Sequence, residues 1–596
     1  MTIFRKIWYL LGQKNHNSAL KLLSMMLIGM VLETLGIGLL IPLLGVVTTP
    51  DLAGTYPALV PWIVKFGTPS QEQIVVVAML ILVTVYAFKA VFLAYLAWRQ
   101  SKFSFGLQVY LSNLLFAGYL RQPYTFHLQR NSAQLIRNVT GEVNEFIGVL
   151  QSSMLLITEG LVMFGIAILL LVTEPLGALL VMTILGFASW GFHKLTKTHI
   201  LRWGERRQYH EGLRLKHLQQ GLGGAKDIKL LGREANFKSL YNFHNSGSAH
   251  VGQRQATLQQ LPRLWLELLA VIGLAALVLI MIVQNKQLNT LLPILGLFAA
   301  AAFRLMPSVN RVIGAIQSLR FGLPVINTLC EEVKQVGVDA SSKFDTKDNL
   351  SLNFDVRLAL KQLYFSYPKT KSPALKGINL HIDRGASTGF IGGSGAGKST
   401  LVDVILGLLQ PESGEVTVDG KNIMTNVRSW QDLVGYVPQS IYLTDDTLRR
   451  NIAFGLADDE INDEFVISAI HAAQLNEFVN DQPKGINAVV GERGVRLSGG
   501  QRQRIGIARA LYHDPSILVL DEATSALDTA TEHSVMKAIK ALQGRKTIII
   551  VAHRLSTVKD CDMLYLLEEG QVIDQGKLSE LVLRHKNLQL PKAFGA

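Results

Sequence analysis

Six long apolar runs occupy the first half of the chain and restrict the folds that it can adopt. Each run approaches or exceeds the ~20 residues that an α-helix needs to cross a bilayer. The mean hydropathy of +0.27 and the charged fraction of 17% also lie outside the range of ordinary soluble proteins. We therefore predict an all-α membrane domain of six transmembrane helices within residues 1–330. The expected spans are residues 20–47, 73–98, 146–172, 176–195, 264–284 and 288–312.

Basic residues are distributed unevenly among the loops between these runs. Residues 194–263 carry thirteen Lys and Arg, whereas Lys65 is the only base in residues 48–72 and Lys286 the only one after the fifth run. By the positive-inside rule, both long loops and both termini face the cytoplasm. The expected location is therefore the cell inner (plasma) membrane. The same rule accounts for the net charge of +13, so we expect no nucleic-acid partner.

The basic loops keep a helical spacing of apolar residues, so we expect the spans to continue as helices into the cytoplasm. The tight TEPLG turn joins the third and fourth runs as a hairpin. Residues 1–18 have the composition of an amphipathic helix at the membrane surface. The outer loop TYPALVPWIVKFG, residues 55–67, is either a short interfacial helix or an ordinary ordered loop.

The second half of the chain has a different character. A polar linker is expected over residues 331–350, and an α/β domain over residues 351–596. The strands are expected in the segments ASTGFIG, SILVLDE and KTIIIVAH, which alternate with helical segments.

A glycine-rich motif follows the first of these strands and precedes a helical segment. This strand–loop–helix context is the one in which G-x-x-x-x-G-K-[ST] binds phosphate, because backbone N–H groups and a helix N-terminus surround the phosphate oxygens. Lys398 is expected to reach the β- and γ-phosphates, and Ser399 to contact Mg²⁺. The motif reads Gly392, Gly393, Ser394, Gly395, Ala396, Gly397, Lys398, Ser399, Thr400.

Two carboxylates end the apolar strand SILVLDE. Asp521 suits a Mg²⁺ ligand, and Glu522 suits a base that orients and deprotonates water. The segment LSGGQ opens a further helix, again with exposed N–H groups that suit phosphate. Together these residues predict an ATP-hydrolysing site with ATP and Mg²⁺ as cofactors.

These motifs resemble those of the ATP-binding cassette (ABC) family over residues 351–596, with Tyr367 in FSYP, Gln439 in YVPQ and His553 in VAHR at the matching places. The resemblance implies head-to-tail dimerisation, in which LSGGQ of one copy completes the ATP site of the other. It implies that Tyr367 stacks on adenine, Gln439 senses Mg²⁺ and His553 contacts the γ-phosphate. It also assigns residues of LSGGQ and of the segment SALD to the composite site: Ser498, Gly499, Gly500, Gln501 and Asp528.

Six spans ahead of one cassette resemble a half-size exporter of this family, and half a transporter implies a homodimer. Residues 121–130 and 223–234 resemble coupling helices that dock on the cassettes; the alternative is solvated turns. The segments LETLGIGLLIPLL and GLGGAKDIKLLGRE resemble the bacterial flippase family that moves lipid-linked oligosaccharides for protein N-glycosylation. That resemblance implies a polyprenyl-pyrophosphate cargo.

Four bases lie in or beside the spans, namely Lys89, Arg263, Arg304 and Arg311. A charge at bilayer depth costs at least ~2.5–3.5 kcal/mol. We predict that these bases hold an anionic cargo, because Arg binds phosphate oxygens through two N–H groups. The alternatives are snorkelling to the interface and pairing with acidic residues such as Glu33 or Glu267.

Other functions remain open at this stage. The cargo of such an exporter is alternatively another lipid, a drug or a peptide. A nucleotide-gated channel or regulator belongs to a different class, and the intact Glu522, Gln439 and His553 argue against it.

Overall fold

The computed structural model describes residues 2–39, 71–173, 175–283, 288–337, 351–370, 372–523, 529–552 and 554–585. The chain forms two compact units. Unit 1 comprises Met1–Gln122 with Arg130–Lys343, and unit 2 comprises Pro123–Gln129 with Phe344–Ala596.

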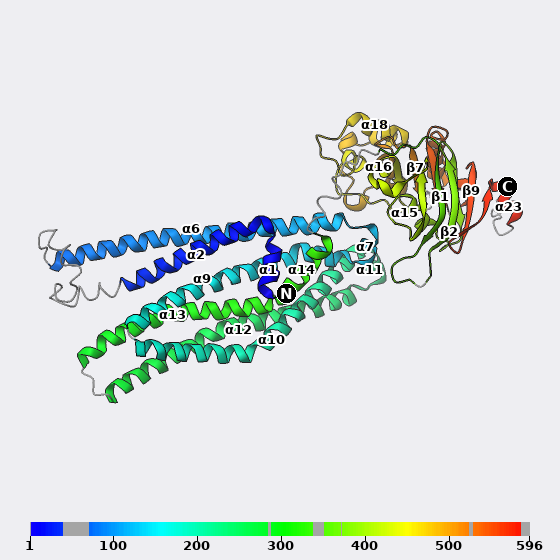
Figure 1. The fold of residues 1–596 in the computed structure, drawn as a ribbon. Helices are drawn as coiled ribbons and strands as arrows, with labels where there is room; N and C mark the ends of the chain where they lie inside the picture. Colours follow the sequence, from blue (N-terminus) through cyan, green and yellow to red (C-terminus); the bar gives the residue numbers. More distant parts are fainter. Residues whose placement is uncertain are drawn as a thin grey trace. The chain divides into compact units, whose positions relative to one another are not determined.

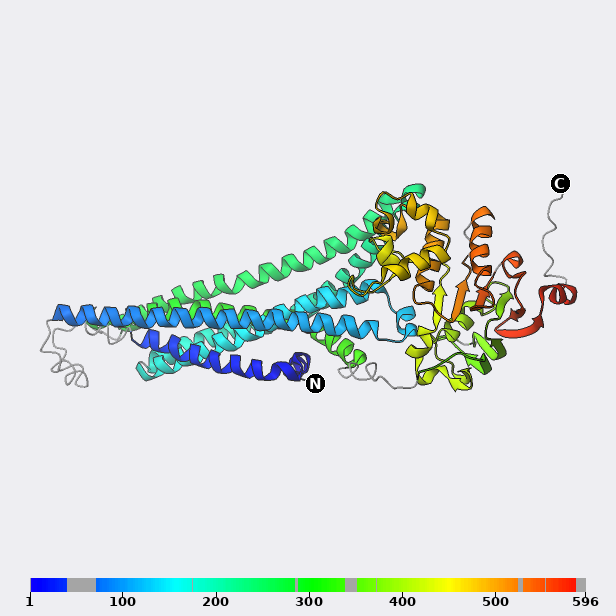
Figure 2. The ribbon, with the colours of Figure 1, turned by 90° about the horizontal axis from the view of Figure 1, so that it is seen from above.

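Unit 1 is built from long helices, several of which run side by side (Figures 1 and 2). Each predicted span falls in or overlaps one of them: α2 (Gln13–Gly38), α6 (Gln71–Leu120), α9 (Val143–Thr173), α10 (Pro175–Gly223), α12 (Glu234–Val283) and α13 (Leu288–Phe321). Among the described residues, three helices are long and apolar enough to cross a membrane, or four if the bent pair at Gly322 counts as one span. The number of six spans thus stays a prediction.

Several local predictions for unit 1 are confirmed. The helices α6, α10 and α12 continue far beyond the apolar runs, with 50, 49 and 50 residues. α9 ends at Thr173 and α10 begins at Pro175, both within the TEPLG segment, as a hairpin requires. The N-terminal segment forms the amphipathic helix α1 (Ile3–Leu11), which is shorter than the predicted residues 1–18 because α2 already begins at Gln13. The outer loop at residues 55–67 lies outside the described residues.

Short helices stand at both predicted coupling segments. These are α7 (Tyr124–Gln129) and α11 (Ala225–Leu231). Between α7 and α9 lie α8 (Ser132–Arg137) and the π-helical turn η2 (Asn138–Glu142). The α7 segment, Pro123–Gln129, belongs to unit 2, which also contains the predicted cassette.

The predicted linker begins later than the sequence indicated. After a bend of 47° at Gly322, the helix α14 (Leu323–Val336) includes the first residues of the expected linker. The reason is a continuous apolar face, on which Leu329, Val333 and Val336 are buried. This face lies against α1 and α6, so the short polar run at residues 331–335 did not end the helix.

Unit 2 contains two sheets. One is antiparallel, with strand order β2-β1-β4-β5, and the other has the order β10-β9-β3-β8-β7-β6. In the second, β3, β8, β7 and β6 run parallel to one another. The three predicted strands are neighbours here, as β3 (Ser387–Gly392), β7 (Ile517–Asp521) and β8 (Thr547–Val551).

The remaining strands and main helices of unit 2 complete an α/β domain, as predicted. The strands are β1 (Arg357–Phe365), β2 (Leu375–Asp383), β4 (Ser413–Val418), β5 (Lys421–Asn422), β6 (Val434–Val437), β9 (Met563–Glu568) and β10 (Gln571–Gly576). The helices are α15 (Lys398–Ile405), α16 (Val427–Asp432), α17 (Leu448–Ile452), α18 (Asp463–Ala472), α19 (Asn476–Asn480), α20 (Gly499–Leu511), α21 (Thr529–Lys540), α22 (Leu555–Val558) and α23 (Leu578–Arg584).

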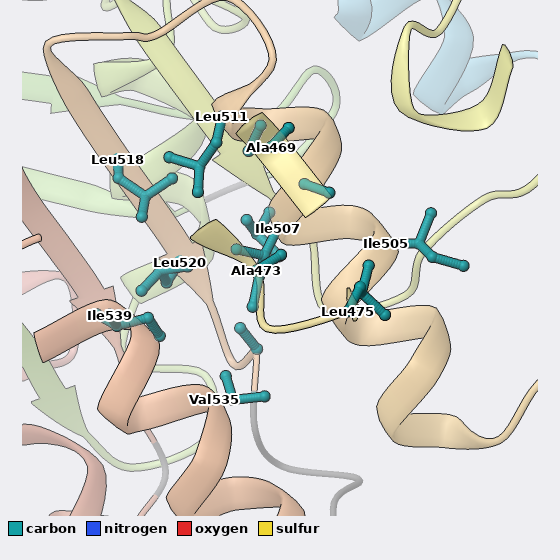
Figure 3. Close-up of a cluster of buried hydrophobic side chains, with 14 of the residues drawn as sticks. Ala469, Ala473, Leu475, Ile505, Ile507, Leu511, Leu518, Leu520, Val535 and Ile539 are labelled. Carbon is teal, nitrogen blue, oxygen red and sulfur yellow. The ribbon is translucent and has the colours of Figure 1, made fainter. Parts of the chain in front are cut away.

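The strand β7 separates two hydrophobic cores. Leu518 and Leu520 face the first core, in which they lie with α20 and α21 (Figure 3). Ile517 and Val519 face the second core, which contains the fully buried Trp430. A strand covered on both faces needs an unbroken apolar sequence, which explains the run ILVL. This double burial fixes the position of the carboxylates that follow the strand.

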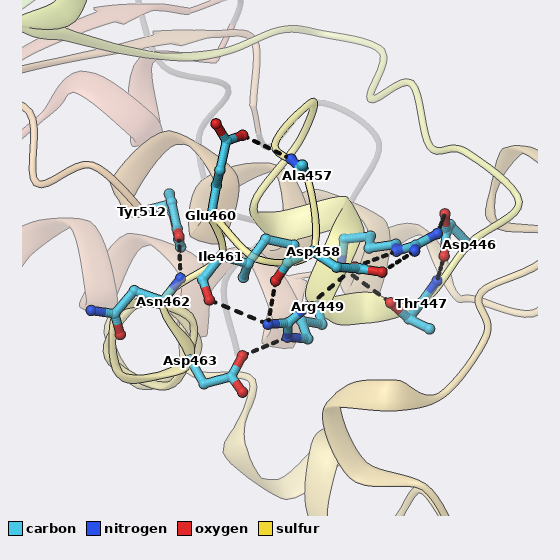
Figure 4. A network of polar contacts seen from close by, with 11 residues as sticks. Asp446, Thr447, Arg449, Ala457, Asp458, Glu460, Ile461, Asn462, Asp463 and Tyr512 are labelled. Carbon is cyan, nitrogen blue, oxygen red and sulfur yellow. Dashed lines mark hydrogen bonds and ion pairs between the residues drawn. The ribbon is translucent and has the colours of Figure 1, made fainter.

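A polar network organises the segment between α17 and α18 (Figure 4). Arg449 Nε contacts an Asp463 carboxylate oxygen at 2.5 Å, and Arg449 Nη2 donates to the Ile461 carbonyl at 3.2 Å. Arg450 contacts Asp446 at 3.0 Å and also Asp458. These exposed pairs each contribute little, but together they fix the loop that joins the two helices.

Candidate functional site

The glycine-rich loop joins β3 to α15. Gly392 has φ +149°, and a Cβ there would lie 2.2 Å from the Leu567 carbonyl oxygen. Gly397 has φ +96°, and its Cβ would lie 2.9 Å from the Ala374 carbonyl oxygen. Only glycine fits both positions, because side chains at these angles are strained and would meet backbone. The loop therefore takes the tight course that turns N–H groups toward a phosphate.

Lys398 is the first residue of α15 and is buried. Its Nζ donates to the carbonyl oxygens of Gly392 and Gly393, at 2.8 and 2.9 Å. Burial lowers the pKa of the Lys398 ammonium, while Glu522 and Asp521 act in the opposite direction. The ammonium is thus held within the loop, where phosphate oxygens are expected to bind.

The two predicted carboxylates stand at the end of β7. Asp521 is the last residue of the strand, and the Tyr436 hydroxyl lies 3.5 Å from its Oδ2. Gln439 Nε2 donates to Glu522 Oε2 at 2.7 Å. Glu522 has φ +47°, an uncommon angle for a side-chain-bearing residue. The structure thus brings Gln439 into contact with Glu522. It also places Glu522 and Asp521 near enough to Lys398 to act on the pKa of its ammonium.

Tyr367 also reaches the helix of the glycine-rich loop. Its hydroxyl lies 3.1 Å from the hydroxyl of Thr400, and its ring meets Phe365 edge-on. This contact holds an aromatic side chain beside α15, and the stacking of Tyr367 on adenine stays a prediction.

Sequence reasoning missed Asp403, which stands on α15 one turn after Ser399. Burial and the nearby Asp521 raise the pKa of the Asp403 carboxyl to about 6. An acid four residues after the hydroxyl that is expected to contact Mg²⁺ was a usable signal, because residues i and i+4 share a helix face.

The LSGGQ segment opens α20, as predicted. Ser498 is its N-cap and accepts from the Gln501 N–H at 3.2 Å, while Gln501 Oε1 accepts from the Ser498 N–H at 2.8 Å. This reciprocal capping box fixes the first turn. Ser498 is exposed, and Gly499 and Gly500 are half-buried.

Two predicted site residues lie outside the described part of the chain. These are His553 and Asp528, together with the segment 525–527 that precedes Asp528. Their predicted roles stay predictions.

Three of the four bases proposed to bind cargo, namely Lys89, Arg263 and Arg311, have acidic partners. Lys89 Nζ lies 2.7 Å from Glu33 Oε2, and Arg263 Nε lies 2.9 Å from Glu267 Oε1. These are the partners that the sequence offered as an alternative.

A third acidic partner was not foreseen. Arg311 Nη1 lies 2.5 Å from Glu159 Oε1, which α9 contributes. The sequence offered Glu33 and Glu267 as partners for these bases, whereas the structure pairs Arg311 with Glu159. The side chain of Arg304 lies outside the described part of the chain, although its backbone belongs to α13.

Arg263 and Arg311 nevertheless share one cavity. It has a volume of about 420 Å³ and lies between α12 and α13, with Glu267 and Asn310 also in its wall. The side chains of Arg263 and Arg311 remain 73% and 51% exposed. Each described ion pair uses one N–H of a guanidinium that carries five. The cavity can therefore offer further donors to an anion.

Comparisons with known proteins agree with this geometry. A family model described as "ABC transporter" matches residues 375–525, and one described as "ABC transporter transmembrane region" matches residues 20–301. The ATP-dependent lipid A-core flippase of Ralstonia nicotianae is 30% identical over 479 residues, which cover 79% of each chain. That of Cupriavidus pinatubonensis is 29% identical over 473 residues, covering 78% of this chain and 79% of that one.

A solved structure shares the fold. The structure of a bacterial Atm1-family ABC exporter with ATP bound superposes with a TM-score of 0.76 at 22% sequence identity, covering 96% of each chain. This similarity extends through both the helical membrane domain and the α/β domain.

Proposed function

The chain belongs to the ABC transporter family as an exporter half-transporter whose ATPase domain drives translocation, and from this we propose that it flips an anionic glycolipid across the bacterial inner membrane. The cargo that we propose is a polyprenyl-pyrophosphate oligosaccharide. We also propose that two copies assemble as a homodimer with their cassettes in the cytoplasm.

In the ATPase step, this chain's residues bind the nucleotide and activate water. The loop N–H groups and Lys398 hold the phosphates, and Tyr367 stacks on the base. Glu522 takes the proton of the attacking water, and its bond from Gln439 keeps the carboxylate in position.

The same site suits a magnesium ion. Asp521, Ser399 and the amide oxygen of Gln439 are hard oxygen donors of the type that Mg²⁺ prefers. The Gln439 amide nitrogen is the atom bonded to Glu522, which leaves the amide oxygen to act as a ligand. Mg²⁺ supplies neutralisation of the phosphate charge.

One observation carries the cargo proposal: Arg263 and Arg311 line the same cavity of the membrane domain. Two guanidinium groups can bind a pyrophosphate through several charge-assisted hydrogen bonds. In the described geometry they contact Glu267 and Glu159, so an anionic head would compete with these carboxylates for the guanidinium N–H groups. The apolar tail of such a cargo can remain in lipid while its polar head crosses.

The relatives' names favour a second candidate, lipid A-core. It shares the phosphate and sugar chemistry of the first candidate but lacks a polyprenyl chain. Flipping measured in proteoliposomes with each lipid, and with a peptide as the third cargo, separates these possibilities. We expect the polyprenyl-pyrophosphate oligosaccharide to be flipped and to stimulate ATP hydrolysis most strongly; a preference for either other cargo would reject the proposal.

The basic residues are tested in the same assay. Replacing Arg304 and Arg311 together by Gln should reduce cargo-stimulated hydrolysis and flipping while basal hydrolysis persists. Arg254→Gln is the matched control, because this arginine is exposed on α12 and does not line the cavity. Unchanged flipping by the double variant would remove these arginines from cargo binding.

A further inference from the structure

A second cavity of unit 1 differs in character from the basic one. It has a volume of about 600 Å³, within the range of ligand pockets, and lies among α6, α9, α12 and α13. Neutral hydrogen-bonding side chains dominate its wall. They include Gln100, Ser104, Gln151, Thr158, Gln255 and Ser318.

The charge in this wall is small. Among the lining residues that the structure describes, Glu145 is the single charged one, and it already pairs with Arg207 at 3.0 Å. The described wall of the cavity therefore offers no unpaired charge to an ionic ligand. A neutral ligand is the better match, because an ionic one would lose hydration without gaining a counter-charge.

Amides and hydroxyls both donate and accept hydrogen bonds, as sugar hydroxyls do. The helix backbone orients several of these groups. The Ser104 hydroxyl donates to the Gln100 carbonyl at 2.9 Å, and the Thr158 hydroxyl to the Met154 carbonyl at 2.9 Å. Ser104 is fully buried, so its hydroxyl closes the wall and does not reach a ligand. The half-buried Thr158 oxygen accepts from Gln100 Nε2 at 3.4 Å, a long bond that a ligand hydroxyl can replace. Phe321 and Val149 add apolar wall area.

The position of this cavity relative to the basic one is informative. On α13, Ser318 follows Arg311 by seven residues, about 10 Å along the same helix face. On α12, Gln255 precedes Arg263 by eight residues, about 12 Å along the axis. In both helices the neutral cavity lies on the side of the predicted cytoplasm. The order from membrane to cytoplasm is therefore apolar span, cationic cavity and neutral polar cavity.

We infer that the neutral cavity is a cytoplasmic loading site for the first sugars of the cargo, next to the cationic cavity that receives its phosphates. The inference rests on the proposed function, because it assigns the saccharide of the same lipid-linked cargo. A polyprenyl-pyrophosphate saccharide has its tail, charge and sugars in the same order as the three regions. The cavity thereby distinguishes a glycosylated lipid from the bare lipid pyrophosphate.

Gly148 offers a way to fill the cavity without disturbing the helix. It lines the cavity, and a Cβ at this position would meet nothing within 4 Å. Leu is also a better helix former than Gly, so Gly148→Leu is expected to leave α9 intact. Gly160→Leu is the matched control, because Gly160 lies on the same helix with equally open space and does not line the cavity.

The test compares two lipids on the full-length protein in nanodiscs, undecaprenyl pyrophosphate with and without an N-acetylglucosamine disaccharide. The readout is the lipid concentration that gives half-maximal stimulation of ATP hydrolysis. For Gly148→Leu we expect this concentration to rise roughly tenfold for the glycosylated lipid, about 1.4 kcal/mol. It should stay within about twofold for the bare lipid, since filling the cavity removes no phosphate contact. The control variant should match the wild type with both lipids.

A second pair of variants removes hydrogen bonding instead of space. Gln255→Leu should weaken the response to the glycosylated lipid alone, whereas Gln253→Leu, an exposed position on the same helix outside the cavity, should not. If the larger side chain at position 148 prevents folding, Gln255→Leu and Gln253→Leu still test the inference.

Several results would overturn the inference. A wild-type protein that responds equally to both lipids has no use for a sugar site, and equal shifts for both lipids in Gly148→Leu would assign the cavity to general packing. If Gly148→Leu no longer elutes as a dimer on size-exclusion chromatography, the cavity is part of the contact with a second copy of the chain and is not a sugar site. A wild-type protein stimulated by neither lipid would reject the proposed function as well, which separates the two failures.

Discussion

Glu332 links α14 to two parts of unit 1 that are distant from it in sequence, at Tyr119 and at Arg130. It lies in α14, and its carboxylate accepts from the Tyr119 hydroxyl of α6 at 2.8 Å and from Arg130 Nη1 at 2.6 Å. The Glu332 side chain is 7% exposed and that of Arg130 is 20% exposed. Because both groups are largely desolvated, removing one leaves the other as a buried charge, which usually destabilises by about 3–5 kcal/mol.

We therefore expect Glu332→Ala to destabilise unit 1 by about 3 kcal/mol, the lower end of that range. The reason is that Arg130 remains partly exposed to solvent and keeps its contact with Gln335. Glu332→Gln keeps a hydrogen-bond acceptor and loses only the charge assistance, so about 1–2 kcal/mol is expected. In a domain of this size, 1 kcal/mol shifts the unfolding temperature by about 2–4 °C.

The assay is thermal unfolding in detergent, followed by intrinsic fluorescence at one fixed scan rate, because such proteins often unfold irreversibly. Glu331→Ala is the matched control, since the neighbouring Glu331 is exposed and should shift stability by no more than about 0.5 kcal/mol. Arg130→Met completes a double-mutant cycle with Glu332→Ala. If the two effects simply add, or if Glu331→Ala and Glu332→Ala behave alike, the buried ion pair does not stabilise this region.

Three further predictions concern unit 2. Glu522→Gln should keep ATP binding and lower turnover by roughly 10²–10⁴-fold, because it removes a general base; near-normal hydrolysis would refute that role. In a mixture of Lys398→Ala and Ser498→Ala chains, activity should partly return if two copies share composite sites, and proven mixing without recovery would count against them. Asp403 binds its proton more tightly in the folded state, at a pKa of about 6, so its contribution to stability should fall as pH rises from about 4 to 6. Asp403→Asn should abolish that dependence in thermal unfolding measured across this pH range.

The parts of the fold that sequence predicted well depend on local patterns. The unbroken run ILVL predicted a strand, and in the structure β7 is that strand and is covered on both faces by two cores. The glycine-rich loop was recognisable because Gly392 and Gly397 occupy positions where a side chain would meet backbone. The ATP-binding loop and the position of the carboxylate pair could therefore be predicted before the structure was known.

The parts that sequence missed depend on contacts between distant residues. Arg311 pairs with Glu159, 152 positions away, and Arg130 with Glu332, 202 positions away. No local spacing indicates such partners, so Glu159 was not among the acids considered for Arg311. The neutral cavity was missed for the same reason, because four helices contribute to it and none has an unusual sequence there.

The unbroken length of α6 and α10 has a mechanical consequence. With 50 and 49 residues and no proline after the first residue of either helix, each is a rod about 75 Å long. A tilt of only about 5° about one end moves the other end of such a rod by about 6 Å. α6 ends just before α7, and α10 just before α11. In the predicted orientation, a small tilt near α7 or α11 therefore moves the opposite end of each rod, at the outer side of the bilayer, by about a helix radius.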